Sequence, residues 1–319
     1  IVPFVGGGYG ILGQWYTSSG NKNGAERIVN ATVAGDQRYI AAQGLSSDEG
    51  VIAWLNLADL HVYARKFDKT GAVLNGSKEF IVNATKAGEQ SNPVVAGASN
   101  GSFAVAWDSE GVDGDASGIA MQRYAANGAL IGSETVVNSF KSGSQITPAI
   151  GMDTAGNFAV AWDSIGQDGD IDGVYGQRFK SDGSKVGAEF AVSQTKTNEQ
   201  QKPVLAMQAD GSFAVAWESY GQPGGAKYDV MLRCYDSSGA AAGNEQLVNS
   251  TTADNQQQPH LIAFADGRYL VVWQSFAEDG AGWGVYGQLL YKDCKAIGNQ
   301  FQIHTTKPSD QTAPRAAVD

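Results

Sequence analysis

The stretch Phe158-Ala159-Val160-Ala161-Trp162 is an apolar run that ends in tryptophan, and it decides the fold because the chain contains it several times. Similar runs end at other tryptophans, which are Trp54, Trp107, Trp217 and Trp273. Successive members of this series, Trp162 included, lie 53, 55, 55 and 56 residues apart. A nearly constant period of about fifty-five residues is the sequence signature of an array of repeated units.

Three further markers recur with the same period. A Gln stands three residues before a Pro or Ile that opens an apolar run, and a Glu or Gln follows each Trp run. The Gln series is Gln37, Gln90, Gln145, Gln200, Gln256 and Gln311. The Pro or Ile series is Ile40, Pro93, Pro148, Pro203, Pro259 and Pro314. The Glu series is Glu26, Glu79, Glu134, Glu189, Glu245 and Gln300. Four markers with one period predict six copies of one unit.

One copy of the repeat contains four short apolar segments. Residues 203–206 start with proline, which a strand tolerates at its first residue, and a turn at residues 209–212 leads to the run ending at Trp217. In the preceding copy, residues 174–179 are rich in β-branched and aromatic side chains, and residues 189–192 form the fourth segment. Because no segment has helical periodicity over a useful length, these segments predict four β-strands.

Three short hairpin links and one longer polar link per copy predict an all-β chain. The architecture we expect is a six-bladed β-propeller with four antiparallel strands per blade. The longer link would carry the chain from the outermost strand of one blade to the innermost strand of the next. A linear β-solenoid is the alternative, although its coils are usually shorter.

The two ends of the chain predict how the ring closes. Residues 314–318 match a first strand, residues 1–5 a second strand and residues 10–16 a third. We therefore expect a closing blade of one C-terminal and three N-terminal strands, from residues 1–30 and 312–319, which leaves no edge strand exposed. The other blades are expected at about residues 38–83, 91–138, 146–193, 201–249 and 257–304. Residues 1–319 would then form a single domain.

Charge and cysteine content restrict the partners. The 319 residues carry a formal net charge of −11, which argues against nucleic acid and anionic membranes and suits cations or neutral ligands such as sugars. No apolar run is long enough to span a membrane. The only cysteines, Cys234 and Cys294, occupy non-equivalent positions in neighbouring copies. We interpret them as free thiols rather than as a disulfide framework.

Carboxylates are concentrated in the links between second and third strands, which should lie on the same rim as the links between blades. Asp168, Asp170 and Asp172 alternate before Gly173, which is the spacing of oxygen ligands in a calcium-binding loop. A weaker version comprises Asp113, Asp115 and Ser117. The sequence thus predicts calcium at these two loops. The alternative is a solvated hairpin loop, because Asp and Gly both suit turns.

Aromatic and amide side chains on the same rim are candidate ligand-binding residues. Tyr220, Tyr228 and Trp283 could stack on a sugar ring, unless Trp283 packs against its own blade. The six Gln residues listed above could offer amides at the mouth of the channel, or could instead satisfy backbone groups of the links between blades. His260 follows Pro259 on an inner strand and would face the channel.

Catalytic signatures are scarce in this sequence. The three histidines, His61, His260 and His304, stand at three different repeat positions. A Gly-x-Ser-x-Gly match occurs at residues 97–101, but it falls in a short turn between two expected strands and not in a strand-to-helix elbow, and no zinc-binding His cluster is present. A carboxylate pair for glycoside cleavage could come from the acidic rim, but the sequence does not select one. We therefore assign no catalytic residue from the sequence.

The repeat resembles a known family of tandem repeats. The run from Phe158 to Ser164, followed by Gln167-Asp168-Gly169-Asp170 and by residues 173–179, is similar to repeats of large exported bacterial proteins. Those proteins often also carry hemolysin-type calcium-binding repeats. The resemblance covers nearly the whole chain and implies export to the periplasm, the cell surface or the medium, with adhesive, surface or carbohydrate-related roles.

These observations lead to one expected function and two alternatives. We expect an exported ligand-binding propeller, lectin-like or adhesive, with calcium on the acidic rim and a carbohydrate or cell-surface component as its partner, rather than an enzyme. One alternative is a polysaccharide-active hydrolase or lyase with its site at the channel mouth. The other is a structural envelope or matrix protein.

Overall fold

The computed structural model describes residues 2–3, 8–46, 48–74, 78–222, 225–305 and 309–318. All regular structure within these residues is β-strand, apart from a single 3-10 position at Leu74. The described part of the chain contains no helix that could cross a bilayer. The all-β class predicted from the repeat is therefore confirmed.

Five of the repeats form four-stranded antiparallel sheets whose strands are paired in chain order. The first sheet contains β5 (Gln37–Ser46), β6 (Glu49–Asn56), β7 (His61–Asp68) and β8 (Phe80–Ile81). The second contains β9 (Gln90–Gly97), β10 (Phe103–Glu110), β11 (Ser117–Tyr124) and β12 (Leu130–Val136). The third contains β13 (Gln145–Met152), β14 (Phe158–Ile165), β15 (Asp172–Phe179) and β16 (Lys185–Ala191).

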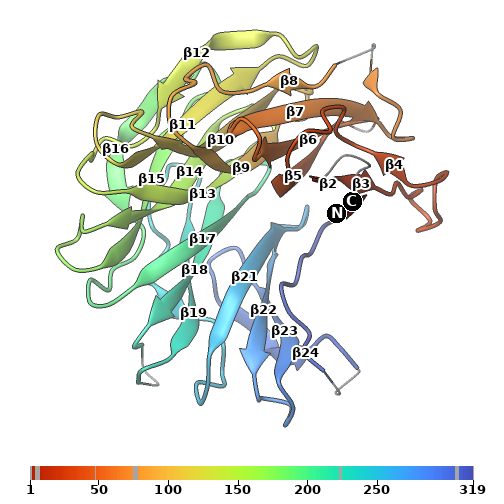
Figure 1. The fold of residues 1–319 in the computed structure, drawn as a ribbon. Helices are drawn as coiled ribbons and strands as arrows, with labels where there is room; N and C mark the ends of the chain where they lie inside the picture. The colour runs from red at the N-terminus through yellow and green to blue at the C-terminus, as the bar shows by residue number, and fades with distance from the viewer. Residues whose placement is uncertain are drawn as a thin grey trace. The chain divides into compact units, whose positions relative to one another are not determined.

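The last two sheets follow the same order. The fourth contains β17 (Gln200–Met207), β18 (Phe213–Tyr220), β19 (Tyr228–Tyr235) and β20 (Gln246–Leu247). The fifth contains β21 (Gln256–Ala263), β22 (Tyr269–Phe276), β23 (Trp283–Leu290) and β24 (Ala296–Gln302). Figure 1 labels these strands, except β20. Four antiparallel strands per repeat are what the sequence predicts for these five copies.

The ends of the chain depart from the prediction. Two-stranded sheets form between β1 (Val2–Pro3) and β2 (Tyr9–Gly10), and between β3 (Leu12–Gly13) and β4 (Arg27–Ile28). The strand predicted over residues 10–16 is thus interrupted, and residues 1, 4 and 5 of the predicted second strand lie outside the described residues.

The strand predicted over residues 314–318 is not formed. The backbone N–H of Ala313 donates instead to Gln274 Oε1 at 3.0 Å, and that of Ala316 to His260 Nδ1 at 3.3 Å. Side chains therefore take the hydrogen bonds that a strand ladder would need.

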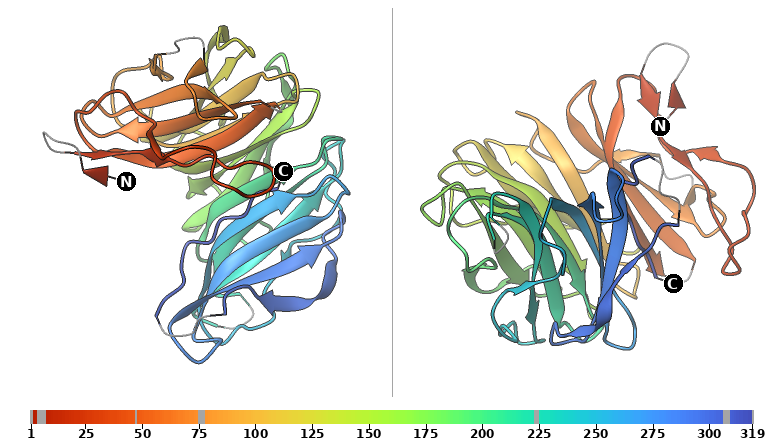
Figure 2. Two further views of the ribbon diagram at one scale, coloured as in Figure 1. Left: turned by 90° about the vertical axis from the view of Figure 1, so that its right-hand side faces the viewer. Right: turned by 90° about the horizontal axis from the view of Figure 1, so that it is seen from below.

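The chain divides into two compact units, residues 1–148 and residues 149–318. Figure 2 shows the sheets of each unit from two further sides, with the second unit coloured from green to blue. Each unit has its own buried core. The second strand of each four-stranded sheet contributes its tryptophan to one of these cores. Trp54, Trp107, Trp162, Trp217 and Trp273 are all fully buried.

Aromatic pairs join the second and third strands at one end of the second, third and fourth sheets. Phe158 stands opposite Phe179 with ring centroids 4.8 Å apart, and Phe213 stands opposite Tyr235 at 4.6 Å. The second strands are buried along nearly their whole length, as in β14, where only Ile165 is exposed. A strand covered on both faces needs a continuous apolar run, which explains why these segments do not alternate.

The Glu series fastens neighbouring repeats to one another. The Glu134 carboxylate accepts hydrogen bonds from the backbone N–H groups of Ala84 and Thr85, at 2.6 and 3.2 Å. Glu79 and Glu245 make the same contacts to the preceding repeat. The carboxylates at these three positions therefore have a structural role between neighbouring repeats.

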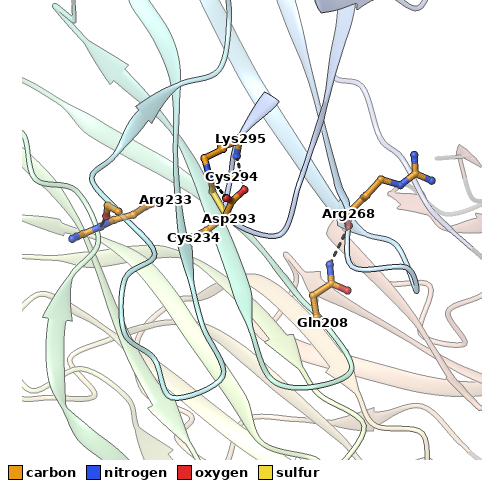
Figure 3. The surroundings of a disulfide bond; sticks show 8 residues. Gln208, Arg233, Cys234, Arg268, Asp293, Cys294 and Lys295 are labelled. Atoms are coloured by element: carbon orange, nitrogen blue, oxygen red, sulfur yellow. Dashed lines mark hydrogen bonds and ion pairs between the residues drawn. A yellow bond between two sulfur atoms is a disulfide. The ribbon is translucent and has the colours of Figure 1, made fainter. Parts of the chain in front are cut away.

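The two cysteines form a disulfide, so the interpretation as free thiols is wrong. Cys234 on β19 is bonded to Cys294 in the turn after β23, with the Cα atoms 5.7 Å apart (Figure 3). Both residues are buried. Non-equivalent repeat positions did not exclude a bond, because the turn of one repeat packs against a strand of the one before it.

Candidate functional site

The acidic hairpin loop and the link between repeats lie at the same end of each sheet, as the strand directions predict. Asp170, in the loop between β14 and β15, accepts a hydrogen bond from the backbone N–H of Asn198 in the next link, at 2.8 Å. Asp115 accepts from Gly143 in the same way at 3.0 Å. In the fifth sheet the direction is reversed, and the backbone N–H of Trp283 donates to Asp310 at 2.9 Å.

The first strand of each four-stranded sheet contains a residue in the left-handed region, two positions after the marker Gln, and Ala313 is the equivalent residue of the last copy, where no strand forms. These residues are Tyr39, Asn92, Thr147, Lys202, Gln258 and Ala313, with φ between 47° and 54°. The strand pairing shifts there, for example between Gln201 and Val204, so this residue forms a β-bulge. A bulge turns its side chain out of the regular ladder, and the same residue differs in every repeat.

In three repeats, the residue that follows the marker tryptophan accepts a hydrogen bond from the bulge residue of the next repeat. Glu218 Oε1 accepts a hydrogen bond from the backbone N–H of Gln258 at 2.7 Å, and Gln274 makes the equivalent contact to Ala313. Asp108 makes it to the backbone of Thr147. The position thus has a structural use in these three repeats, which any catalytic role must accommodate.

Asp108 differs from Glu218, at the same repeat position, because no cation accompanies it. Asp108 Oδ2 accepts hydrogen bonds from Asn92 Nδ2 at 2.6 Å and from Ser91 Oγ at 3.4 Å. Asp108 Oδ1 is buried without a partner. In the fourth sheet the residue equivalent to Asn92 is Lys202, whose Nζ lies 3.0 Å from Glu218 Oε2.

Burial raises the pKa of Asp108 to about 7. Hydrogen bonds from Asn92, Thr147 and Ser91 oppose the rise, and the negative charge of Glu89 adds to it. Glu89 is exposed at the end of the same sheet, and its backbone N–H donates to Glu110 at 3.0 Å. A carboxyl that titrates near neutral pH beside a second carboxylate is a candidate acid–base group.

Sequence reasoning did not select Asp108. The signal available was the residue after the marker tryptophan, which reads Leu55, Asp108, Asp163, Glu218 and Gln274 along the chain. Three acids in succession occur there, but the partner of each carboxyl group depends on the neighbouring bulge residue, which the repeat pattern does not specify.

The two predicted calcium loops adopt turns that use some of their carboxylates internally. Asp113 is buried and accepts from Asn138 Nδ2 at 2.6 Å, while Ser117 begins β11. Asp168 Oδ1 accepts from the backbone N–H of Asp170 at 3.1 Å. Burial, with the charges of Glu199 and Asp168, raises the pKa of Asp172. Within the described residues, no group of three or more His, Cys, Asp or Glu side chains is arranged for a metal ion, so calcium stays a prediction.

The three predicted aromatic residues form two separate pairs. Tyr220 and Tyr228 meet edge to face with centroids 5.0 Å apart, and the Tyr228 hydroxyl donates to Glu199, which together with burial raises the tyrosine pKa. Trp283 contacts Phe276 at 5.2 Å and is half-buried. The first pair lies beside a carboxylate, which is the chemistry expected of a sugar contact.

The six marker Gln residues bond to the links. Each amide nitrogen donates to one or two backbone carbonyls just before it in the chain. The acceptors are Ala34 and Gly35 for Gln37, Ala87 and Gly88 for Gln90, Ser142 and Gly143 for Gln145, Thr197 for Gln200, Asp254 for Gln256 and Ser309 for Gln311. Two of them also accept from the buried indole N–H, Gln90 from Trp107 and Gln256 from Trp273. All but Gln311 are fully buried, which favours the reading that they serve the link.

His260 lies on β21 and is partly buried. Its Nδ1 accepts the backbone N–H of Ala316. Burial, aided by the positive charge of Arg315, lowers the pKa of His260 to about 4. The imidazole is therefore neutral at physiological pH and already partnered by the C-terminal segment.

No protein family and no curated protein is matched by the sequence. Solved structures do resemble the fold. An alpha-L-arabinanase of Penicillium chrysogenum, complexed with arabinobiose, is 12% identical with a TM-score of 0.55, over 88% of this chain and 84% of that chain. An alpha-L-arabinofuranosidase of Fusarium graminearum with arabinobiose is 12% identical with a TM-score of 0.56, over 88% and 83%. A protein of unknown function from Dyadobacter fermentans is 10% identical with a TM-score of 0.52, over 84% and 83%.

At these identities the likeness shows a shared fold, that of β-propeller proteins. The expectation of a lectin-like or adhesive binding protein is wrong, and so is the expectation that the chain is not an enzyme, because the similar structures of known activity are carbohydrate-cleaving enzymes. The sequence could not separate the two classes, since carboxylates and aromatic rings serve both sugar binding and sugar cleavage. The alternative of a polysaccharide-active enzyme is better supported.

Proposed function

We propose that this chain is a polysaccharide-active glycoside hydrolase in which Asp108 is the general acid and Glu89 the second carboxylate. The observation that carries the proposal is the pKa of Asp108, about 7, in a fold shared with two enzymes named for arabinose-containing substrates. A carboxylic acid that remains protonated near neutral pH can donate its proton to a leaving group.

Glycoside cleavage needs two carboxyl groups in different protonation states. A protonated acid protonates the glycosidic oxygen, while a carboxylate attacks the sugar or activates a water molecule. Asp108 is buried with a free oxygen, and Glu89 is exposed and adds a negative charge nearby. The two environments push the carboxyl groups toward these separate roles.

Asp108 suits the acid role better than Glu218 at the same repeat position. Glu218 is fully buried, and its carboxylate is already engaged by the Lys202 ammonium and by the backbone N–H of Gln258. Asp108 has an amide, Asn92, in place of that lysine. The exchange of Lys202 for Asn92 at the bulge therefore distinguishes Glu218, a structural carboxylate, from Asp108, the candidate acid.

A panel of polysaccharides that includes arabinan, assayed by release of reducing sugar, tests the proposal. We expect Asp108→Asn to lower kcat by at least about 100-fold and Glu89→Gln to lower it comparably, because each removes a group that takes part in proton transfer or attack. Asp163→Asn is the matched control, since Asp163 follows its tryptophan as Asp108 does and is also buried.

The control separates catalysis from folding. Equal losses of activity in the Asp108 and Asp163 variants, tracking their thermal stability, would indicate a purely structural position. Full activity in Asp108→Asn would remove the assignment.

The six-bladed ring, closed by both chain ends, belongs to the same proposal. It is supported by the six copies of the Gln and Glu markers and by the shared propeller fold. Spin labels placed at Tyr16 and Val318, both exposed, should give one short and narrow distance distribution if the ends share a blade. A broad distribution at long distance would count against closure.

Export is supported by the disulfide. Bonds such as Cys234–Cys294 persist mainly in oxidising compartments outside the cytosol. The location implied by the family resemblance, outside the cytoplasm, is therefore part of the proposal.

A further inference from the structure

A polar clamp near the end of each repeat links the fourth strand to the third. In four repeats an Asn side-chain oxygen accepts the backbone N–H near the start of the third strand, at 2.8 or 2.9 Å. The pairs are Asn30 with Ile11, Asn83 with Val62, Asn138 with Ile119 and Asn249 with Val230. The amide nitrogen of the same Asn donates to the carbonyl two residues further on.

The amide nitrogen of the clamp also meets a titratable side chain. Asn138 donates to Asp113 at 2.6 Å, Asn249 donates to Asp229 at 2.7 Å, and Asn83 meets His61 at 3.1 Å. Where the acid comes from the hairpin loop, as Asp113 does, the residue of the third strand that faces its carboxylate is a glycine. A Cβ at Gly118 would lie 2.9 Å from Asp113 Oδ2. In three of these four repeats, the clamp thus pairs an acid or histidine with an amide donor.

The third sheet breaks this clamp, because Ser193 stands where the other repeats have Asn or His304. Ser193 Oγ still accepts the N–H of Val174, at 3.1 Å, but it has no amide group. The acid is retained: Asp168 covers Gly173, where a Cβ would lie 2.9 Å from Asp168 Oδ2. Asp168 Oδ2 is buried and has no partner.

Two further side-chain oxygens of this region, Gln200 Oε1 and Asp172 Oδ1, are also left without a partner. In the second clamp Gln145 Oε1 accepts from Asn138 at 2.9 Å, whereas its counterpart Gln200 Oε1, in a fully buried residue, is unpaired. Trp217 Nε1 can occupy one of its two lone pairs. Asp172 Oδ1, at the start of β15, is also buried and unpaired, and Asp168 is close enough for its charge to act on Asp172.

Exchange of Asn for Ser removes two heavy atoms, which leaves room for about one water molecule or ion. A water molecule could donate two hydrogen bonds there, but it would leave two neighbouring carboxylates uncompensated. Buried charges are normally paired or bound to a metal. Oxygen donors from carboxylates and an amide are those that Ca²⁺ prefers.

We propose that Asp168, Asp172, Gln200 and Ser193 bind one Ca²⁺ ion in the place of the missing clamp amide. The site shares Asp168 and Asp172 with the loop prediction but not Asp170, whose carboxylate bonds to the following link. Two acidic ligands suffice, with water completing the coordination. The other repeats need no ion, because their clamps contain a donor.

Thermal unfolding and calorimetric titration of the full chain, stripped with a chelator and then given calcium chloride, test this site. We expect calcium to raise the unfolding midpoint by several degrees with one ion bound, and magnesium at equal concentration to do so far less. Ser193→Asn should raise the midpoint of the stripped protein and abolish the calcium response, because the restored amide takes the place of the ion. Asp168→Asn should bind calcium at least about tenfold more weakly.

A transplant in the second sheet is the matched control. Asn138→Ser alone should lower stability without tight calcium binding, since Ser117 stands where the third sheet has Asp172. Asn138→Ser combined with Ser117→Asp should create calcium binding around Asp113. No calcium response in the wild type, or an unchanged response in Ser193→Asn, would overturn the proposal. These outcomes are independent of hydrolase activity.

Discussion

Asp108 illustrates how one neighbour sets the properties of a carboxyl group. Three repeats place an acid after the marker tryptophan, but only the fourth sheet supplies a lysine, Lys202, at the bulge beside it. Asn92 hydrogen-bonds to Asp108 without compensating its charge. The consequence is a buried group whose protonation changes near pH 7.

The raised pKa of Asp108 predicts how stability depends on pH. A carboxyl with a folded pKa of about 7 and an ordinary unfolded value binds its proton more tightly in the folded state. Its contribution therefore stabilises the protein fully at low pH and is lost as pH rises between about 4 and 7, with a slope of at most about 1.4 kcal/mol per pH unit. Urea unfolding of the wild type and Asp108→Asn across this range measures it.

The difference between the two stability profiles isolates this group from the other acids. A profile of Asp108→Asn that falls with pH as steeply as the wild type would show that the Asp108 carboxyl titrates normally.

Residues could be predicted from the sequence where the repeat supplies a comparison. The fastening role of the Glu series and the link contacts of the Gln series follow from their presence in every copy. Asp108 and Ser193 could not be selected, because their importance lies in a partner that is exchanged elsewhere: Lys202 for Asn92, and Asn138 for Ser193.

At the scale of elements, periodicity predicted the strands well. The Trp runs form the second strands because they are covered on both faces, and tight turns fix the hairpins. The terminal segments deviate, since Pro314 and the left-handed Ala313 direct backbone groups toward Gln274 and His260 instead of a strand.

The disulfide is the element-scale feature most open to measurement. It closes a loop across a sequence separation of 60 residues and joins β19 to the turn after β23. Replacing Cys234 and Cys294 together by alanine should lower stability by about 2–5 kcal/mol, through a less restricted unfolded chain. Thermal unfolding, with the reduced wild type alongside, measures the loss.

Unfolding of the double variant should resemble that of the reduced protein. A variant as stable as the oxidised wild type would mean that the bond does not constrain the fold in solution.

At the scale of the whole molecule, repetition gave the fold class but not the activity. Six equivalent copies predict a propeller, and the similar solved structures share that fold. Function lies in the positions where copies differ, which include the bulge residues and the clamp. A propeller scaffold tolerates such exchanges because the buried Trp, Gln and Glu contacts hold each blade independently of them.

The pH dependence of kcat/KM on a hydrolysed polysaccharide tests the central claim most directly. If Asp108 is the general acid, kcat/KM should fall as pH rises through about 7, in step with loss of its proton, and Asp108→Asn should lack both the activity and this limb. Failure of the wild type to release sugar from any polysaccharide of the panel, or a rate unaffected by pH near 7, would contradict the account.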